Sequence, residues 1–472
     1  MNYKKSQDFG SGSMTKLVIR QALPLTVSTL AQILYNIVDR IFIGHIGGDD
    51  ITPLTGIGLT LPIVSVISAF TYLLGQGGSP LFSIARGEGN DKKAGKILGN
   101  SITMLLIASA ILTLAGEIFM KPILYLFGAG NDSYVYASDY LSIYLIGTVF
   151  TMLASGLNGY VSAQGFPGVA MITVMSGAVI NTALDPVFIF ALGLGIRGAA
   201  IATVISQFIS CVWVQGFIFG KKAIIRPSRS DLIPDPVICG RTLLMGLTGF
   251  IMEINNCLVQ VICNRTLRKY GADLASVYIA IMTIVHSVRA FMSAAVTGIT
   301  SGSSPVIGYN YGAGKYDRVR SGIRISCLFA FVYTAAAWMI ILIFPGVFIS
   351  LFSRDPSANE LAVPYLHIFF MAYVFMALQF SGQSTFMALG KAPQAIFFSI
   401  FRKVILVIPL TICLPMFLED PVSGVFWAEP VSNVIGGSAS FLFMYFTVYR
   451  KLGKEAVKPR QERHTPDRGS EI

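Results

Sequence analysis

Charged side chains are scarce in this sequence. Asp, Glu, Lys and Arg make up only 12% of its 472 residues, whereas soluble globular proteins carry about 25%. Hydrophobic residues make up 54%, and a soluble chain of this length cannot hide so much apolar surface in ordinary cores. The composition therefore excludes soluble, secreted, disordered and coiled-coil proteins, and it predicts a protein that crosses a membrane many times.

The usual marks of an enzyme or a metalloprotein are missing too. The six cysteines form no CxxC pair and show no metal-ligand spacing, so neither a disulfide framework nor a zinc site is expected. GLGIRG at 193–198 follows an apolar segment rather than a strand, which argues against a phosphate-binding loop. Because no nucleophile–base pair, P-loop or cofactor motif is found, we expect no enzyme and no cofactor. If the protein moves a compound across the membrane, the energy for that transport would then come from a gradient of H⁺ or Na⁺.

Apolar segments separated by breakers predict an all-α polytopic membrane protein with twelve transmembrane helices. The start of the sequence lacks the pattern of a cleavable signal peptide, so the first apolar segment is expected to target the chain. The predicted spans are residues 17–43, 55–84, 95–119, 138–162, 168–192, 198–219, 240–266, 275–307, 322–350, 361–388, 394–418 and 423–449.

Basic residues are distributed unevenly over the connections between these spans. If the amino terminus is cytoplasmic, the inner connections and tails hold 27 of the 35 Lys and Arg residues and the outer connections hold 6. This count assigns Lys391, Arg402 and Lys403 to the inner side, and it leaves Arg40 and Arg289 within spans. Retention of bases in the cytoplasm explains the net charge of +11 without a nucleic-acid partner. We therefore expect both termini to lie in the cytoplasm.

The sequence contains an internal repeat. A shift of 225 residues places Gly77-x-Ser79-Pro80 on Gly302-x-Ser304-Pro305, and Gly165 on Gly390. Each half has six predicted spans, so both halves share one orientation and form two pseudo-symmetric six-helix lobes around a central cleft. Transporters of this design expose the cleft to each side in turn by rocking the lobes. The predicted parts are an inner segment 1–16, a first lobe 17–219, a linker 220–239, a second lobe 240–449 and a basic tail 450–472.

Several stretches together resemble those of a known family. They are LP at 23–24, YNIVDRIFIGHIG at 35–47, GQGGSPLFSIARGEG at 75–89, NTALDPVFIF at 181–190, GIRGAAIATVIS at 195–206, SGSSPVIGYNYGAGK at 301–315 and GVFWAEPVSNVIGG at 424–437. The chain resembles the MATE (multidrug and toxic compound extrusion) transporters over about residues 15–450. The resemblance implies two six-helix bundles and export, driven by H⁺ or Na⁺, of amphipathic organic compounds that are often cations. It also implies a first-lobe ion site at Asp39, Asn181, Asp185 and Thr203.

The residues of the first lobe support such a site. Ionisable residues at bilayer depth are costly and are candidates for function, and Asp39 and Asp185 both lie well inside spans. Helical spacing places Gln32, Tyr35 and Asn36 on the face of Asp39, Asn181 on that of Asp185, and Gln207 on that of Thr203. Oxygen-rich groups of this kind suit Na⁺ or a carboxyl group that binds a proton. The alternative is that Asp39 merely pairs with Arg40 or Arg289.

The second lobe carries two acids inside its spans, Glu253 and Glu429. Glu253 resembles a seventh-span glutamate that some members of the family use, and Glu429 falls on the repeat position of Thr203. Either could attract a cationic compound in the cleft or form a hydrogen bond that packs helices. Pro24, fifteen residues before Asp39, is the predicted hinge of the first span, because proline removes a backbone hydrogen bond.

From this resemblance we expect a monomeric antiporter in the lipid bilayer of the bacterial inner membrane. It would export amphipathic organic compounds, which the family resemblance implies to be cationic, in exchange for H⁺ or Na⁺. Two alternatives stay open. A lipid or lipid-linked glycan flippase of the same superfamily would have a strongly cationic cleft. A membrane receptor or scaffold would bind without transport.

Overall fold

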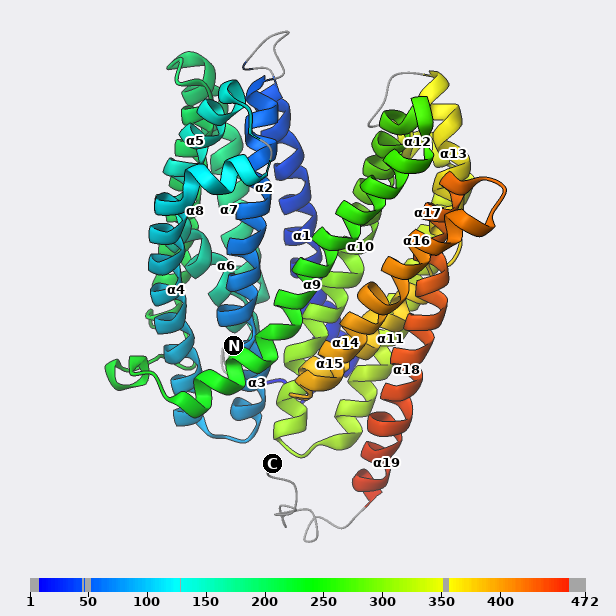
Figure 1. Ribbon diagram of the computed structural model, residues 1–472. Coiled ribbons are helices and arrows are strands. Elements are labelled where there is room, and N and C mark those ends of the chain that lie inside the picture. Colours follow the sequence, from blue (N-terminus) through cyan, green and yellow to red (C-terminus); the bar gives the residue numbers. More distant parts are fainter. Residues whose placement is uncertain (1–7, 45, 47–51, 128, 351–355, 458–472) are drawn as a thin grey trace.

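The computed structural model describes residues 8–44, 46, 52–127, 129–350 and 356–457 (Figure 1). Within these residues the chain forms helices and turns, and no strand occurs. The helices divide into two groups, which lie beside each other and diverge toward one end of the molecule. We call them the first lobe (α1 to α8) and the second lobe (α9 to α19).

The first lobe holds six spans. Its elements are α1 (Met14–Gly44), α2 (Thr52–Thr71), the π-helical turn η2 (Tyr72–Gln76), α3 (Gly78–Gly87), α4 (Asp91–Leu126), α5 (Asn131–Ile146), α6 (Thr148–Ala163), α7 (Pro167–Pro186), the π-helical turn η3 (Val187–Ala191) and α8 (Gly195–Ile218).

A connection with the short 3₁₀ turn η4 (Arg229–Leu232) leads to the second lobe. Its elements are α9 (Pro236–Tyr270), η5 (Ala272–Leu274), α10 (Ala275–Gly312), α11 (Tyr316–Ile343), α12 (Pro345–Ser350), α13 (Pro356–Phe370), α14 (Phe375–Ala388), α15 (Ala392–Ile400), η6 (Phe401–Val407), α16 (Ile408–Phe417), α17 (Pro421–Ser432), η7 (Asn433–Gly437), α18 (Ser438–Met444), η8 (Tyr445–Tyr449) and α19 (Arg450–Val457).

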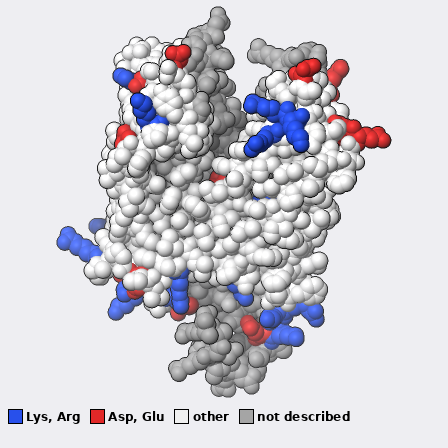
Figure 2. Space-filling view, viewed as in Figure 1, with Lys and Arg blue, Asp and Glu red and all other residues white. Residues whose placement is uncertain are grey.

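The predicted number of spans is confirmed. Ten helical stretches of the described chain are long and apolar enough to cross a membrane, and two bent pairs bring the number to twelve. The bent pairs are α5 with α6, at 57°, and Glu360–Phe370 with α14, at 48°. Large apolar side chains such as Leu114, Ile118 and Phe417 point outward. On the face that Figure 2 shows, a broad band with few charged side chains lies between two charged rims.

The repeat glycines end helices at matching places in the two lobes. Gly89 and Gly314, which the repeat superposes, have φ values of +73° and +66°. Gly165 and Gly390 form the second such pair, with φ values of +91° and +73°. Other side chains rarely adopt this left-handed conformation, so the repeat preserves four sharp turns between consecutive helices.

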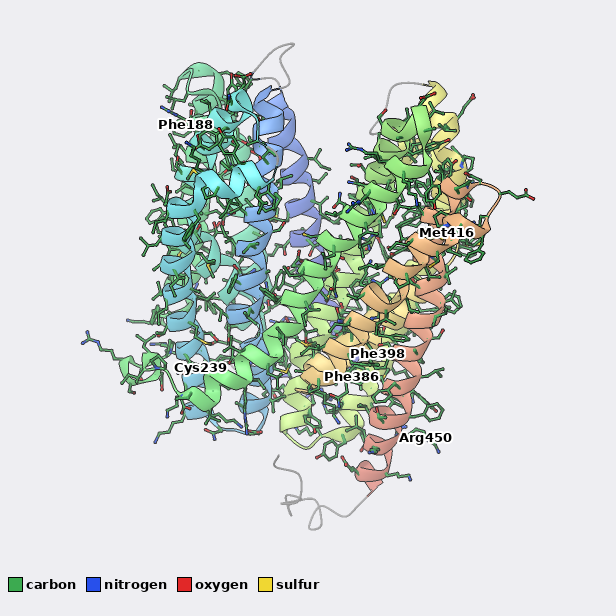
Figure 3. The ribbon with its side chains drawn as sticks, in the orientation of Figure 1. Phe188, Cys239, Phe386, Phe398, Met416 and Arg450 are labelled. Carbon is green, nitrogen blue, oxygen red and sulfur yellow. The ribbon has the colours of Figure 1, made fainter. Side chains whose placement is uncertain are left out.

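Each lobe has a hydrophobic core of its own. The largest buried cluster of the first lobe extends from Ile43 to Ile225, and that of the second lobe from Val259 to Phe426. Lower in the second lobe, the rings of Phe386 and Phe398 stack with centroids 5.9 Å apart (Figure 3). Two cores joined along one interface are the architecture expected of lobes that move as units.

The lobes meet at the end of the molecule that holds the start of α1 and the end of α19, here called the terminus end. Here α1 packs against α10, α3 against α10, and η2 against α9. At the opposite end, where α1 and α9 finish, the space-filling surface is notched between the lobes (Figure 2). The protein is therefore closed at the terminus end and open at the other.

Candidate functional site

Three helices of the first lobe bring the predicted ion-site residues together. Asn181 and Asp185, one turn apart on α7, are 0% exposed, and Thr203 on α8 is 3% exposed. In the amide orientation that satisfies both neighbours, Asn181 donates a hydrogen bond to Asp185 Oδ2 at 2.9 Å. Its oxygen then accepts from the backbone nitrogen and the Oγ1 of Thr203, both at 3.2 Å. These three residues thus form one buried polar unit.

Asp39 and Tyr35 approach this unit from α1. Asp39 is half-buried and lies near enough to Asp185 for the two carboxyl groups to interact. Tyr35, one turn before Asp39, lies close to Thr203. Two carboxyl groups, an amide and two hydroxyl groups therefore converge from α1, α7 and α8. The side chain of Asn36, which was predicted to share this face, lies outside the described residues.

Sequence reasoning missed two tyrosines of α5 at this site. Tyr140 and Tyr144 stack with ring centroids 5.9 Å apart, and both interact with Tyr35. Tyr140 also lies near both Asp39 and Thr203. No periodicity links α5 to α1, so the sequence carried no direct signal for this contact.

The supporting polar face lines a small cavity of the first lobe. Gln32 and Tyr35 reach it from α1, and Gln207 reaches it from α8, as the helical spacing predicted. Its other lining residues are Ala154, Ser155, Thr173, Val174, Gly177, Ala178 and Ser210. Neither Asp39 nor Asp185 is among these residues, and Gln32 and Ala178 precede the two acids by about two helical turns.

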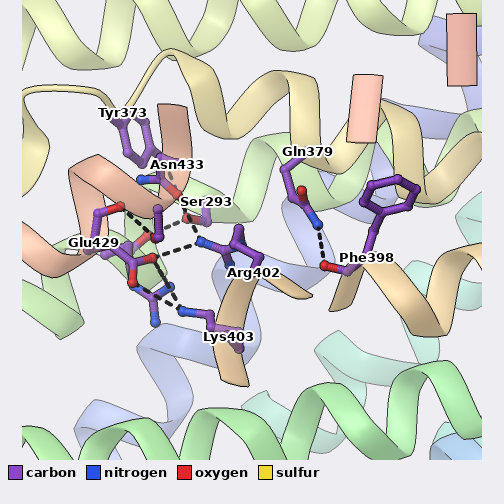
Figure 4. A network of polar contacts seen from close by, with 10 residues as sticks. Ser293, Tyr373, Gln379, Phe398, Arg402, Lys403, Glu429 and Asn433 are labelled. Carbon is purple, nitrogen blue, oxygen red and sulfur yellow. Dashed lines mark hydrogen bonds and ion pairs between the residues drawn. The ribbon is translucent and has the colours of Figure 1, made fainter. Parts of the chain in front are cut away.

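The second lobe carries a different network at the corresponding place (Figure 4). Glu429 on α17, only 3% exposed, is contacted by three bases. Arg402 Nη1 lies 3.0 Å and Arg289 Nη1 3.5 Å from Glu429 Oε1, while Lys403 Nζ lies 3.2 Å from Oε2. Arg402 also donates to Asn433 Oδ1 at 2.8 Å. Both carboxylate oxygens are therefore held by bases of the same lobe.

The assignment of Arg402 and Lys403 to an inner connection was wrong. They belong to η6, in the middle of a span, and are only 8% and 5% exposed. The count of basic residues had assigned them to an inner connection, although the predicted span 394–418 contains them. Without these two residues the inner connections and tails hold 25 basic residues and the outer connections hold 6. A buried carboxylate, which sequence alone could not place beside them, neutralises part of their charge.

The structure also bears on the alternative that Asp39 pairs with Arg40 or Arg289. Arg289 instead pairs with Glu429 of its own lobe. Arg40 is therefore the remaining candidate partner for Asp39, and its side chain lies outside the described residues. Glu253 on α9 lies near Tyr72 of η2, at the interface of the lobes. Within the described residues Glu253 forms no ion pair, in contrast to Glu429.

The internal repeat relates the two sites. With the shift of 225 residues, Arg402 and Lys403 fall on Gly177 and Ala178, which line the first-lobe cavity. After one inserted residue, Asn433 falls on Gln207, another lining residue. A common scaffold thus holds a small cavity in one lobe and, at matching positions of the other, a cluster of bases around one acid.

The MatE family model matches residues 24–187 and 250–413, one copy in each lobe. The chain belongs to the MatE family. The resemblance seen in the sequence is confirmed, and the protein is a multi-pass membrane protein of a family of efflux transporters, whose relatives are transporters rather than enzymes.

Relatives named as exporters match nearly the whole chain. The multidrug export protein MepA of Staphylococcus haemolyticus is 26% identical over 441 residues, which cover 93% of this chain and 94% of MepA. An FAD transporter of Shewanella oneidensis is 25% identical over 436 residues, which cover 91% of this chain and 94% of that transporter.

Solved structures share the fold. A MATE crystal structure in complex with MaL6 superposes with a TM-score of 0.89 at 21% identity, over 95% of this chain and 99% of the other. A MOP-superfamily transporter of Pyrococcus furiosus, described as having a binding pocket of reverse polarity, gives 0.88 at 20% identity, again over 95% and 99%. At this identity the likeness establishes the fold alone.

Proposed function

We propose that this MatE protein is a secondary active antiporter, which exports amphipathic organic compounds in exchange for H⁺ or Na⁺. The observation that carries the proposal is the meeting of Asp39, Asn181, Asp185 and Thr203 inside the first lobe. Carboxylate, amide and hydroxyl oxygens are the ligands of a hard cation. Two neighbouring carboxyl groups equally suit the binding of one shared proton, because two like charges repel each other.

Binding of the driving ion would be coupled to movement of the lobes through the charges of Asp39 and Asp185. An ion moving with the membrane potential supplies about 2.3 kcal/mol per charge per 100 mV. Binding of that ion would remove the repulsion between Asp39 and Asp185 and draw α1 toward α7 and α8. Because α1 also packs against α10 of the second lobe, a movement of α1 is positioned to reshape the interface between the lobes.

The closed terminus end and the notched opposite end support alternating access by a rocking movement. We propose that the terminus end faces the cytoplasm of a bacterial inner membrane, because basic residues predominate there. The lobes would then be open to the outside, which is the state that releases an exported compound and takes up the driving ion. A monomer suffices, because both lobes lie in one chain.

The charge of the exported compound is the open question of this proposal. The relatives named for multidrug export support drug-like compounds, and Glu253 is the interface carboxylate that a cationic compound would find. The relative named as an FAD transporter and the bases around Glu429 favour a negatively charged compound. They also favour the flippase alternative, because that alternative requires a cationic cleft. A receptor or scaffold would bind the same compounds without flux.

Proteoliposomes test the proposal directly. Purified protein would be given a pH gradient and a Na⁺ gradient separately, and the flux of ethidium and of carboxyfluorescein would be recorded. One gradient should drive flux of at least one dye in the wild type, and Asp39→Asn and Asp185→Asn should each lose that dependence. Asp139→Asn is the matched control, because Asp139 forms an exposed ion pair with Arg197 at the end of the lobe. If Asp39→Asn transports normally while Glu253→Gln is inactive, the coupling site lies in the second lobe; if no gradient drives flux, the protein is no antiporter.

A further inference from the structure

The bases around Glu429 carry more charge than the acid can neutralise. Arg289, Arg402 and Lys403 all lie within 3.5 Å of one carboxylate, and no second acid joins them in the described structure. At least one positive charge therefore remains in the interior of the second lobe, because two arginines face a single carboxylate. Buried charges are costly unless they are paired, so a purely structural network would be expected to balance its charges.

The three bases are bound to different degrees. Arg402 has two short contacts, at 3.0 Å with Glu429 and at 2.8 Å with Asn433, and Lys403 reaches both carboxylate oxygens, at 3.3 and 3.2 Å. Arg289 has only the long contact of 3.5 Å, and its buried Nε has no hydrogen-bond partner. At 21%, its side chain is also the most exposed of the three. Arg289 is thus the base with donors left for another molecule.

Hydroxyl groups lie beside Arg289. Ser293, one turn later on α10, donates a hydrogen bond to the Arg289 carbonyl oxygen at 2.7 Å, and its Oγ lies 3.4 Å from the hydroxyl oxygen of Tyr373 (Figure 4). Tyr373 and His286 both lie close enough to interact with the Arg289 charge. A guanidinium group with nearby hydroxyl groups is the usual recognition set for a carboxylate, phosphate or sulfonate.

The open end of the second lobe is basic as well. Arg265, Arg268 and Lys269 are exposed on the last turns of α9, with Asp273 following them. Basic side chains form a large group on this lobe next to the notch (Figure 2). Such a group attracts anions to the mouth of a cleft. It lies on the side where the count of basic residues is otherwise low, so retention of bases in the cytoplasm does not explain it.

We propose that Arg289, backed by Lys403 and Arg402, binds the anionic group of the transported compound. The site takes an amphipathic organic anion whose carboxylate, phosphate or sulfonate completes the charge balance of the second lobe. The ion site of the first lobe and the anion site of the second then divide the two tasks of transport between the lobes. This inference rests on the proposed export function, and it replaces the cationic compound with an anionic one.

Binding tests the site without any gradient. Full-length protein in a neutral detergent would be titrated with carboxyfluorescein or ethidium, while thermal unfolding and dye anisotropy are followed. Carboxyfluorescein should raise the Tm of the wild type, and Arg289→Gln should weaken its binding about tenfold or more, since a charge-assisted hydrogen bond is lost. Arg289→Lys should bind with intermediate affinity, because it keeps the charge but not the fork of donors. Arg197→Gln, on an exposed outer turn, should bind normally.

The ligand-free Tm separates recognition from a structural role. Arg289→Gln removes excess charge, so its ligand-free Tm should equal or exceed that of the wild type. A lowered Tm together with unchanged carboxyfluorescein binding would overturn the proposal and make Arg289 a structural residue. Binding of ethidium alone by the wild type would overturn it as well.

A short-chain lipid tests whether the bound anion is a lipid headgroup or a soluble compound. If dihexanoyl-phosphatidylglycerol raises the Tm and carboxyfluorescein does not, the site recognises a lipid headgroup, and the soluble anion is overturned. Carboxyfluorescein bound through Arg289 in a protein that transports neither dye under any gradient would support the anion site and overturn the antiporter. Gradient-driven ethidium flux without anion binding would keep the antiporter and overturn the anion site.

Discussion

Gly302 of α10 lies directly against Ala22 of α1, so that a β-carbon added to Gly302 would come 2.6 Å from the Ala22 nitrogen. The same occurs where η2 meets α9, because a β-carbon on Gly77 would come 2.5 Å from Gly246 Cα. Glycines let the backbones of two helices approach in a membrane. The closed terminus end is therefore built from backbone contacts between the lobes, which a larger residue would prevent.

Replacing Gly302 with valine should open the terminus end. The atoms that the new side chain meets belong to the α1 backbone and cannot give way, and such overpacking costs about 1–3 kcal/mol. That cost would lower the population of the closed state roughly 5- to 150-fold. Spin-label distances between α1 and α10 should lengthen, and export should fall in proportion.

Gly216→Val is the matched control. Gly216 lies in α8, and a β-carbon there would have no atom within 4 Å. The control should transport like the wild type. If Gly302→Val keeps both the wild-type distances and the wild-type flux, these glycines do not determine closure.

The segment before α1 ties the two lobes together at this end. Arg318 of α11 donates hydrogen bonds to the carbonyl oxygens of Phe9, Ser11 and Gly12, at 3.1, 3.0 and 2.9 Å. Phe9 is 2% exposed, and Arg86 of α3 lies over its ring. Arg318→Gln should therefore increase hydrogen–deuterium exchange of residues 9–13 severalfold. Arg324→Gln, whose exposed side chain bonds Tyr449, should not, and equal exchange in both variants would show that the segment is held by other contacts.

Asp8 gives this segment a defined pH dependence. Partial burial alone would raise the pKa of Asp8, but hydrogen bonds from Ser11 and Gly10 and the charge of Lys315 lower it below the ordinary value. A lowered pKa in the folded state stabilises the segment above the ordinary pKa of about 3.9, and the contribution is lost as the pH falls through the lowered value. Exchange of residues 9–13, corrected for intrinsic rates, should thus stay constant from pH 8 to 5 in the wild type. Asp8→Asn should exchange faster over that whole range, and a change near pH 6 in the wild type would contradict the assignment.

The sequence predicted much of this architecture because membrane helices obey strong rules. Twelve apolar segments, the repeat glycines and the one-turn spacing of Asn181 and Asp185 all follow from local pattern. The contacts of Tyr140 and Tyr144 with the ion site depend on how α5 packs, which no period encodes. Arg402 and Lys403 were misplaced for a related reason: bases favour the cytoplasmic side, and only the tertiary position of Glu429 explains their burial. The predicted boundaries of the lobes and the roles of the site residues stay predictions.

The hydroxyl group of Thr203 is the part of the proposed ion site that can be removed with the least change of shape. Thr203→Val keeps the shape but deletes the contact with Asn181, which then holds Asp185 less firmly. A neutral hydrogen bond contributes about 0.5–1.5 kcal/mol, so the affinity for the driving ion should fall roughly two- to tenfold. Thr203→Ser should stay near the wild type, and Thr60→Val, which removes a buried hydroxyl bonded only within α2, should have no effect. The half-saturating ion concentration of dye flux measures this, and an unchanged value in Thr203→Val would remove Thr203 from the site.

Pro24 lies where a bend of α1 would act on the second lobe. The helix is continuous from Met14 to Gly44, and the neighbours of Pro24 at Ala22 and Thr26 contact Gly302 and Gly298 of α10. Proline cannot donate a backbone hydrogen bond, so this turn bends at lower cost than the rest of the helix.

Pro24→Ala restores the missing donor and should stiffen α1 at its contact with the other lobe. Export should then fall severalfold, while the amount of protein in the membrane and the affinity for the driving ion stay unchanged. Pro122→Ala, at an exposed place near the end of α4, should leave export intact. Flux per molecule, measured together with spin-label distances across the open end, decides the matter: a Pro24→Ala protein that transports at the wild-type rate would show that α1 does not bend there during transport.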